Sequence, residues 1–242
     1  MAELPPLRLK APSGGIYLPL RRIESMTQDE IQSLAFSPDI QPLVEKNGNL
    51  VSFGFDDIPL ALIRAASPII DMAFANLAPG ERRKQIILPT NDTIAYAELF
   101  HVLELSLKAR RPLKVATMHD HPIMAYRRIR IAAINLAMST IADDLEVRTN
   151  GMLNPDLRTS TLKIPAADAE AVFNLYASTD ALRIAVVGAV GRGLSCRRIG
   201  KVHFGQIKQL MKENTGIKDE VMAAKRKWDD KWEAGEDVYV RQ

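Results

Sequence analysis

The stretch RIAVVGAVGRGLSCRRIGKVHFG, residues 183–205, holds the residue types best suited to binding phosphate. Gly188, Gly191 and Gly193 follow an apolar run, as in loops whose backbone N–H groups cradle a nucleotide. Their spacing is G-x-x-G-x-G rather than G-x-G-x-x-G, and Gly200 interrupts the helix that should follow such a loop. We therefore predict that the glycines end a helix and turn the chain.

Cationic side chains follow these glycines without any intervening acid. Between Gly191 and Lys212 there is no Asp or Glu, and the cations are Arg192, Arg197, Arg198, Lys201, Lys208 and Lys212, with His203 among them. Uncompensated positive charge over such a span is the expected footprint of a surface that binds nucleic-acid phosphates. We predict that Arg192, Arg197, Arg198 and Lys201 contact phosphate. The alternative is an ordinary solvated basic face.

A second group of arginines, Arg127, Arg128 and Arg130, lies in a segment expected to form an apolar helix. At 100° per residue, Arg127 and Arg130 fall within the apolar arc, whereas Arg128 joins a narrow polar strip. A buried guanidinium needs a carboxylate or a phosphate, because burying it unpaired is very costly. We predict that all three arginines bind nucleic acid. Pairing of Arg127 and Arg130 with a distant Asp or Glu is the structural alternative.

Metal and nucleophile chemistry have weaker support. His119 and His121 form the H-x-H pair found in several metal-dependent hydrolases, but a metal site needs further ligands, and the sequence has only two other histidines. Asp120 serves more simply as the cap of the following helix. Cys196 is the only cysteine, so no intramolecular disulfide forms and a reducing compartment is favoured. Arginines beside Cys196 could lower the pKa of its thiol. We predict no metal, no cofactor and no catalytic residue.

Two tryptophans lie near the C-terminus, on a helix rich in charged residues. Val221, Ala224, Trp228 and Trp232 recur at a spacing that places them on one helix face. Such a stripe either docks on the protein's own core or anchors a neighbouring subunit, since tryptophans dominate interface energetics. We predict that Trp228 and Trp232 make subunit contacts, with docking on the core as the alternative.

Helical periodicity with start and stop signals covers most of the chain. A capping box at Thr27–Glu30 predicts a helix over 28–36, and Asp92 with Thr93 predicts one over 93–109. Other predicted helices are a short one between Ser37-Pro38-Asp39 and Asn47-Gly48, one over 58–77 capped by Asp56-Asp57 and kinked near Pro68, and those over 121–142, 166–186, 203–214 and 217–233. Residues 85–88 and 113–117 are either strands of a strand–helix–strand unit or extended linkers.

Composition is that of a folded protein, with 242 residues, 47% hydrophobic, 25% charged and a net charge of +3. We expect a mainly α fold: an N-terminal arm over 1–20, a single helical core over 21–215, and a C-terminal helix and tail over 216–242. The core has the option of two lobes meeting near 112–120. The N-terminus lacks the apolar stretch of a signal peptide, and no apolar run of membrane-spanning length is present, so we expect a soluble, intracellular protein without a membrane partner.

This layout of basic helical core and flanking arms resembles helical viral coat and nucleocapsid proteins. It implies a non-enzymatic, self-assembling protein that packages RNA through sequence-independent phosphate contacts, in a virion or in host cytoplasm. Its partners would be RNA and copies of itself. Two alternatives remain open. One is an α/β metal- or nucleotide-dependent enzyme that uses residues 85–121, and the other is a bacterial DNA-binding accessory protein.

Overall fold

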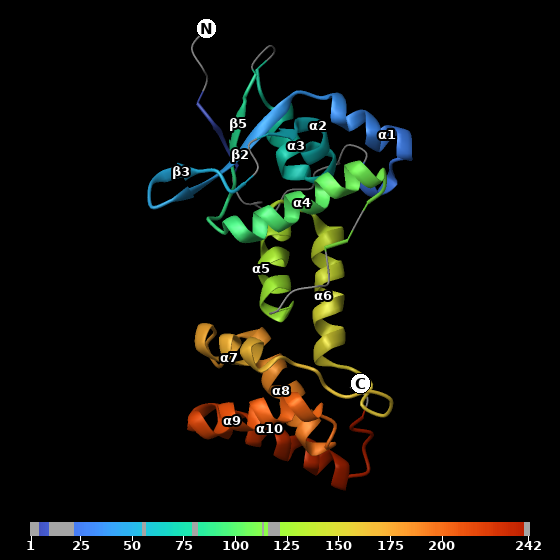
Figure 1. The fold of residues 1–242 in the computed structure, drawn as a ribbon, viewed down its shortest axis with the longest axis vertical. Coiled ribbons are helices and arrows are strands. Elements are labelled where there is room, and N and C mark those ends of the chain that lie inside the picture. The colour runs from blue at the N-terminus through green and yellow to red at the C-terminus, as the bar shows by residue number, and fades with distance from the viewer. Residues whose placement is uncertain are drawn as a thin grey trace. The chain divides into compact units, whose positions relative to one another are not determined.

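The computed structural model describes residues 5–9, 22–54, 57–78, 82–112, 114–115 and 122–239, shown in Figure 1. Within them are ten α-helices, two 3-10 helices and five short strands, which confirms the mainly α prediction. The chain divides into two compact units. The first comprises Met1–Met118 and Ala125–Leu145, and the second comprises His119–Met124 and Glu146–Gln242.

The strands form one small sheet in the first unit. The order is β1 (Leu7–Arg8), β5 (Gln85–Ile87), β2 (Asp39–Lys46) and β3 (Asn49–Val51), and β4 (Ile58–Pro59) also pairs with β2. β5 runs parallel to both of its neighbours, whereas β2 is antiparallel to β3 and β4. Of the two alternatives for residues 85–88, strand or extended linker, the structure has the strand, as β5.

The helix predicted after Ser37-Pro38-Asp39 is wrong, because this segment forms strand β2. Its residues Ile40, Leu43 and Val44 are buried, and its backbone pairs with three other strands. Asn47 and Gly48 both have positive φ, 53° and 78°, as the two central residues of a type I′ turn require. The Asn-Gly pair is therefore a hairpin turn and not the end of a helix.

The helices that follow the capping signals begin where predicted. The Thr27 hydroxyl accepts from the Glu30 N–H (3.3 Å) and the Glu30 carboxylate accepts from the Thr27 N–H (2.7 Å), which starts α1 (Gln28–Ser33). A 3-10 turn, Leu34–Phe36, continues it. Asp92 accepts from the Ala95 N–H at 3.1 Å and starts α4 (Thr93–Ala109).

The segment predicted as one kinked helix over 58–77 forms two separate helices. α2 (Leu60–Ala66) and α3 (Pro68–Ala75) are separated at Ser67, whose hydroxyl accepts from the Ile70 N–H and donates to the Leu136 carbonyl. The residue at the N-cap position of α2 is Pro59. The predicted cap at Asp57 is therefore wrong. Asp56, the other residue predicted as a cap, lies outside the described residues.

The predicted helix over 121–142 is interrupted after fourteen residues. α5 (Pro122–Asn135) and α6 (Ser139–Leu153) are joined by a turn in which Ala137 has a φ of 54°. The N–H of Met138 donates to the Ala133 carbonyl at 2.8 Å, and Met138 is buried. This closes α5 in the manner of a Schellman motif with alanine where glycine is usual. Residues 116–121, including His119, Asp120 and His121, lie outside the described residues, and Lys114 and Val115 form no strand.

Helices make up almost all regular structure of the second unit. They are α7 (Ala166–Leu175), α8 (Ala181–Ser195), α9 (Lys201–Glu213) and α10 (Thr215–Glu233), with the first residues of α5 and the end of α6. The predicted continuous helix over 166–186 is wrong, because Asp180 accepts from the Leu182 N–H and starts a new helix there. The predicted helices over 203–214 and 217–233 are confirmed by α9 and α10.

A buried carboxylate from a distant part of the sequence caps the start of α5. Asp168, at the beginning of α7, is fully buried and accepts hydrogen bonds from the N–H groups of Ile123 (3.1 Å) and Met124 (3.3 Å). These N–H groups belong to the first turn of α5, where a helix leaves its donors unsatisfied. Asp168 therefore caps α5, in addition to favouring the N-terminus of its own helix.

The glycines of residues 188–193 lie inside α8, so the prediction that they end a helix is wrong. A Cβ atom on Gly191 would lie 2.7 Å from Cβ of Ala224 and 2.8 Å from the backbone N of Lys225, both in α10. Gly191 therefore permits α8 and α10 to pack at close range. Inside a helix the glycine N–H groups bond to carbonyls four residues earlier, which excludes the phosphate loop considered for this stretch.

Candidate nucleic-acid interface

The turn between α8 and α9 presents two of the arginines predicted from sequence. Arg197 has a φ of 53°, its N–H donates to the Leu194 carbonyl at 3.2 Å, and the N–H of Arg198 donates to the Gly193 carbonyl at 2.8 Å. This is a Schellman closure of α8 with arginine at the left-handed position. Both arginine side chains are exposed.

A short parallel bridge places another lysine beside this turn. The Leu162 N–H donates to the Arg198 carbonyl (2.7 Å), and the Gly200 N–H donates to the Leu162 carbonyl (3.1 Å). Lys163 follows Leu162 directly and is exposed. No local signal predicts the place of Lys163, because nothing in TSTLKIP indicates pairing with residues almost forty positions later.

The N-terminus of α9 adds a further group of donors. Lys201 is the first residue of α9, and Gly200 before it provides no side-chain cap. The first N–H groups of a helix have no partner within it and carry partial positive charge, so they favour an anion. His203 lies in the same turn, and its buried Nδ1 has no hydrogen bond to a described residue.

Four cations thus surround one turn of the second unit, and we call this set, Lys163, Arg197, Arg198 and Lys201, the α8–α9 basic corner. All four are exposed, and none forms a side-chain hydrogen bond or ion pair with another described residue. Their charges are therefore available to an external anion. Exposed cations without counter-ions are what phosphate binding requires.

Arg192, predicted to join these residues, lies in the interior instead. Its side chain is 1% exposed, its Nη2 donates to the Pro155 carbonyl at 3.1 Å, and its guanidinium lies 5.8 Å from the centroid of the Trp228 ring. A cation over the face of an indole is held by the quadrupole of the ring. In this structure Arg192 connects α8 to α10 and is not part of the α8–α9 basic corner.

Arg127, Arg128 and Arg130 lie in the part of α5 that belongs to the first unit, whereas the residues of the corner belong to the second. Arg128 forms a two-pronged pair with Asp92, Nε to Oδ2 at 2.8 Å and Nη2 to Oδ1 at 2.6 Å. It therefore ties α5 to the start of α4. Arg127 and Arg130 are half-buried rather than enclosed. Their binding of nucleic acid stays a prediction.

The Arg128–Asp92 pair should make the stability of the first unit sensitive to acid. Burial raises the pKa of Asp92, but hydrogen bonds from Arg128 and from the Ala95 N–H outweigh it and bring this pKa below its usual value. A carboxyl with a lowered folded-state pKa stabilises the fold above its unfolded-state pKa of about 3.9, and this contribution is lost as the pH falls through the folded-state pKa. We expect Asp92→Asn to flatten the decline of the urea midpoint below pH 4. Identical decline in the wild type and the variant would contradict this assignment.

Trp228 and Cys196 both pack within the second unit. Trp228 is partly buried against Arg192, which favours the core-docking alternative, whereas Trp232 is 50% exposed and meets Tyr239 edge-on at 5.3 Å. Burial raises the pKa of the Cys196 thiol, outweighing Arg192 and Arg198. The net lowering of this pKa considered from the sequence is therefore wrong, although Arg198 does act in that direction.

The described residues contain no group of three or more His, Cys, Asp or Glu side chains placed to hold a metal ion. Among the described helices, none combines the length and apolar character needed to cross a bilayer. No protein-family model matches the chain, and neither a curated protein nor a solved structure matches it.

Proposed function

We propose that this protein binds single-stranded RNA through the phosphate backbone at the α8–α9 basic corner. The observation that carries the proposal is the set of four exposed cations without counter-ions among the described residues, gathered around one turn. The uncapped start of α9 would complete a phosphate site with backbone donors. Lysine and arginine at phosphates position a nucleic acid without reading its bases.

Self-assembly on RNA, as in coat and nucleocapsid proteins, is the second part of the proposal. Trp232 supports it, because half of this large side chain is exposed on α10. Phe204 is 44% exposed in the first turn of α9, beside the corner, and offers a ring that can stack on any base. Both features fit a protein that covers RNA irrespective of sequence.

The direct test is fluorescence anisotropy of labelled 20-nucleotide RNAs of two unrelated sequences, at 50 to 300 mM KCl. We expect equal affinity for both sequences and a steep loss of affinity with salt, about 0.7 in log K per log salt for each phosphate contacted. Electron microscopy of the mixture should show large particles that salt disperses. A protein that stays monomeric and does not bind RNA at 50 mM KCl would overturn the proposal.

Arg197→Gly separates the role of this arginine in binding from its role in folding. Because Arg197 holds a left-handed φ, glycine there should relieve about 1 kcal/mol of strain. The matched control is Arg110→Gly, since Arg110 has the same φ of 53° at the end of α4 in the first unit and is exposed. We expect both variants to unfold at equal or higher urea concentration, but only Arg197→Gly to weaken RNA binding, by about threefold to tenfold. Equal RNA affinities would contradict the role assigned to Arg197.

A further inference from the structure

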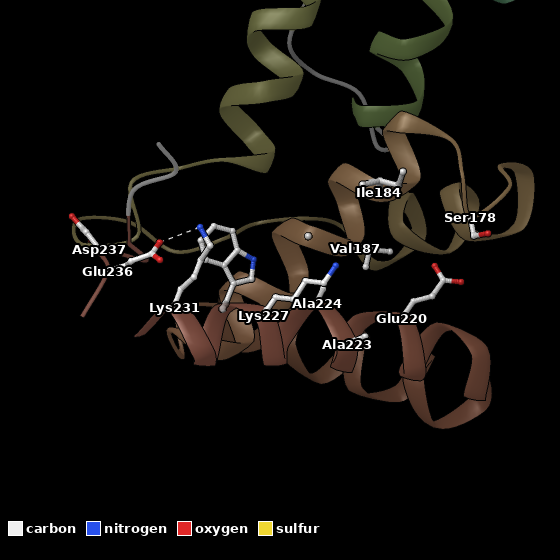
Figure 2. Close-up of a pocket in the computed structure, with 12 residues that line it drawn as sticks. Ser178, Ile184, Val187, Glu220, Ala223, Ala224, Lys227, Lys231, Glu236 and Asp237 are labelled. Atoms are coloured by element: carbon white, nitrogen blue, oxygen red, sulfur yellow. Dashed lines mark ion pairs between the residues drawn. The ribbon is translucent and has the colours of Figure 1, made fainter. Parts of the chain in front are cut away.

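A second feature of the second unit is a groove of about 550 Å³ between α8 and α10. Its apolar wall is formed by Ile184, Val187, Gly188, Ala223, Ala224 and Trp228, and the side chains that line it are shown in Figure 2. This volume lies within the range of small-molecule binding sites. A Cβ atom on Gly188 would meet nothing within 4 Å, so the groove remains open at that residue.

One cation at the rim of this groove has no counter-ion among the described residues. Each lining acid already has a counter-ion: Glu220 pairs with Arg183 (2.5 Å), Glu236 pairs with Lys231 (3.2 Å), and Asp237 pairs with Arg158. Lys227 also lines the groove but forms no hydrogen bond or ion pair with a described residue. Among the described residues that line the groove, the uncompensated charge is therefore a single positive charge, at Lys227.

Lys227 is placed to meet a ligand lying along the apolar wall. Figure 2 shows its side chain extending from α10 over Ala224 toward Val187 of α8. Beside it Trp228 offers an aromatic surface, with the ammonium of Lys231 5.3 Å from the ring centroid. An apolar body would bury against the wall while an anionic head pairs with the Lys227 ammonium.

We propose that this groove binds an amphipathic monoanion, a carboxylate on an unbranched aliphatic chain. The apolar wall favours an aliphatic body over a base or sugar, which would leave polar groups without partners there. The single uncompensated cation favours one negative charge over two. This site uses none of the residues of the α8–α9 basic corner, so it is independent of the RNA proposal.

Trp228 provides the readout for the test, since the protein has only two tryptophans. In a Trp232→Phe background, all indole emission comes from Trp228 in the wall of the groove. Titration with dodecanoate below its micelle concentration should shift this emission and saturate, while dodecanol should bind about fivefold more weakly because it lacks the charge. No saturable shift, or equal affinity for both compounds, would overturn the proposal.

Two variants in the same background locate the site. Lys227→Gln should bring the dodecanoate affinity down about fivefold, to that of dodecanol, and leave dodecanol unchanged. Gly188→Leu should abolish binding of both, because the new side chain fills open space in the groove. Gly151→Leu, at an α6 glycine that also has no atom within 4 Å of a Cβ and lies outside the groove, is the matched control and should bind normally. Retention of dodecanoate affinity in Gly188→Leu would overturn the assignment, and unchanged RNA binding in that variant would keep the two proposals separate.

Discussion

Gly191→Val is expected to lower the free energy of unfolding of the second unit by about 3 kcal/mol, because overpacked helix contacts carry penalties of this order. A Cβ atom there would lie 2.7 Å from Cβ of Ala224, 2.8 Å from the Lys225 nitrogen and 2.9 Å from the Ala224 carbonyl carbon. Two of these atoms are backbone, which cannot rotate aside as a side chain can. Relief therefore requires α10 to move away from α8, and this exposes Val221 and the Arg192–Trp228 contact.

Gly188→Ala is the matched control for this clash. Gly188 lies one turn earlier in α8, and a Cβ there meets nothing within 4 Å. Replacing a glycine inside a helix by alanine at such a position should raise stability by about 0.5 to 1 kcal/mol. Urea unfolding followed by tryptophan emission measures both variants, since Trp228 and Trp232 both lie in α10. If Gly191→Val were as stable as Gly188→Ala, the close approach of α8 and α10 would be refuted.

Neutralising the whole α8–α9 basic corner should have the largest effect on RNA binding. A variant with glutamine at Lys163, Arg197, Arg198 and Lys201 is expected to bind RNA about 100-fold more weakly at 50 mM KCl. Each of the four wild-type cations is expected to contact one phosphate and release its counter-ions, and glutamine cannot do so. The slope of log affinity against log salt should fall by about three in magnitude. Stability should change little, since none of the four side chains bonds to another described residue.

The control for this variant removes the same charge from the first unit. Four exposed cations there, likewise without side-chain bonds to described residues, are replaced by glutamine: Lys46, Lys108, Arg110 and Arg111. Net charge is then identical in the two variants. If both lose affinity equally, RNA responds to overall charge and the corner is not a site. If neither loses affinity, the interface lies elsewhere on the chain.

Local signals in the sequence predicted well wherever neighbouring residues alone decide the structure. The Thr27–Glu30 capping box and the Asp92 cap act within one turn, so the starts of α1 and α4 follow from sequence. α9 and α10 likewise keep their predicted bounds within two residues. The exposed positions of Arg197 and Arg198 also follow from local pattern, because a polar turn after an apolar helix faces solvent.

Prediction failed wherever a distant partner decides the outcome. Residues 39–46 form a strand because their backbone pairs with β5 and β3. The Asn47-Gly48 pair is itself a local signal for a hairpin turn. α5 ends at Asn135, and the left-handed position of the turn that follows is taken by Ala137 instead of the usual glycine. Ser67, between α2 and α3, donates to a carbonyl 69 residues away.

The sequence by itself therefore determined a mainly helical chain with an acid-free run of cations, because composition, periodicity and caps act locally. Tertiary structure alone decided which cations have partners inside the protein and which lie side by side. It buried Arg192 against Trp228, paired Arg128 with Asp92, and placed Lys163 beside Arg198. It also explains why residue 191 is a glycine, because the need for a residue without a side chain arises only where α10 packs against α8.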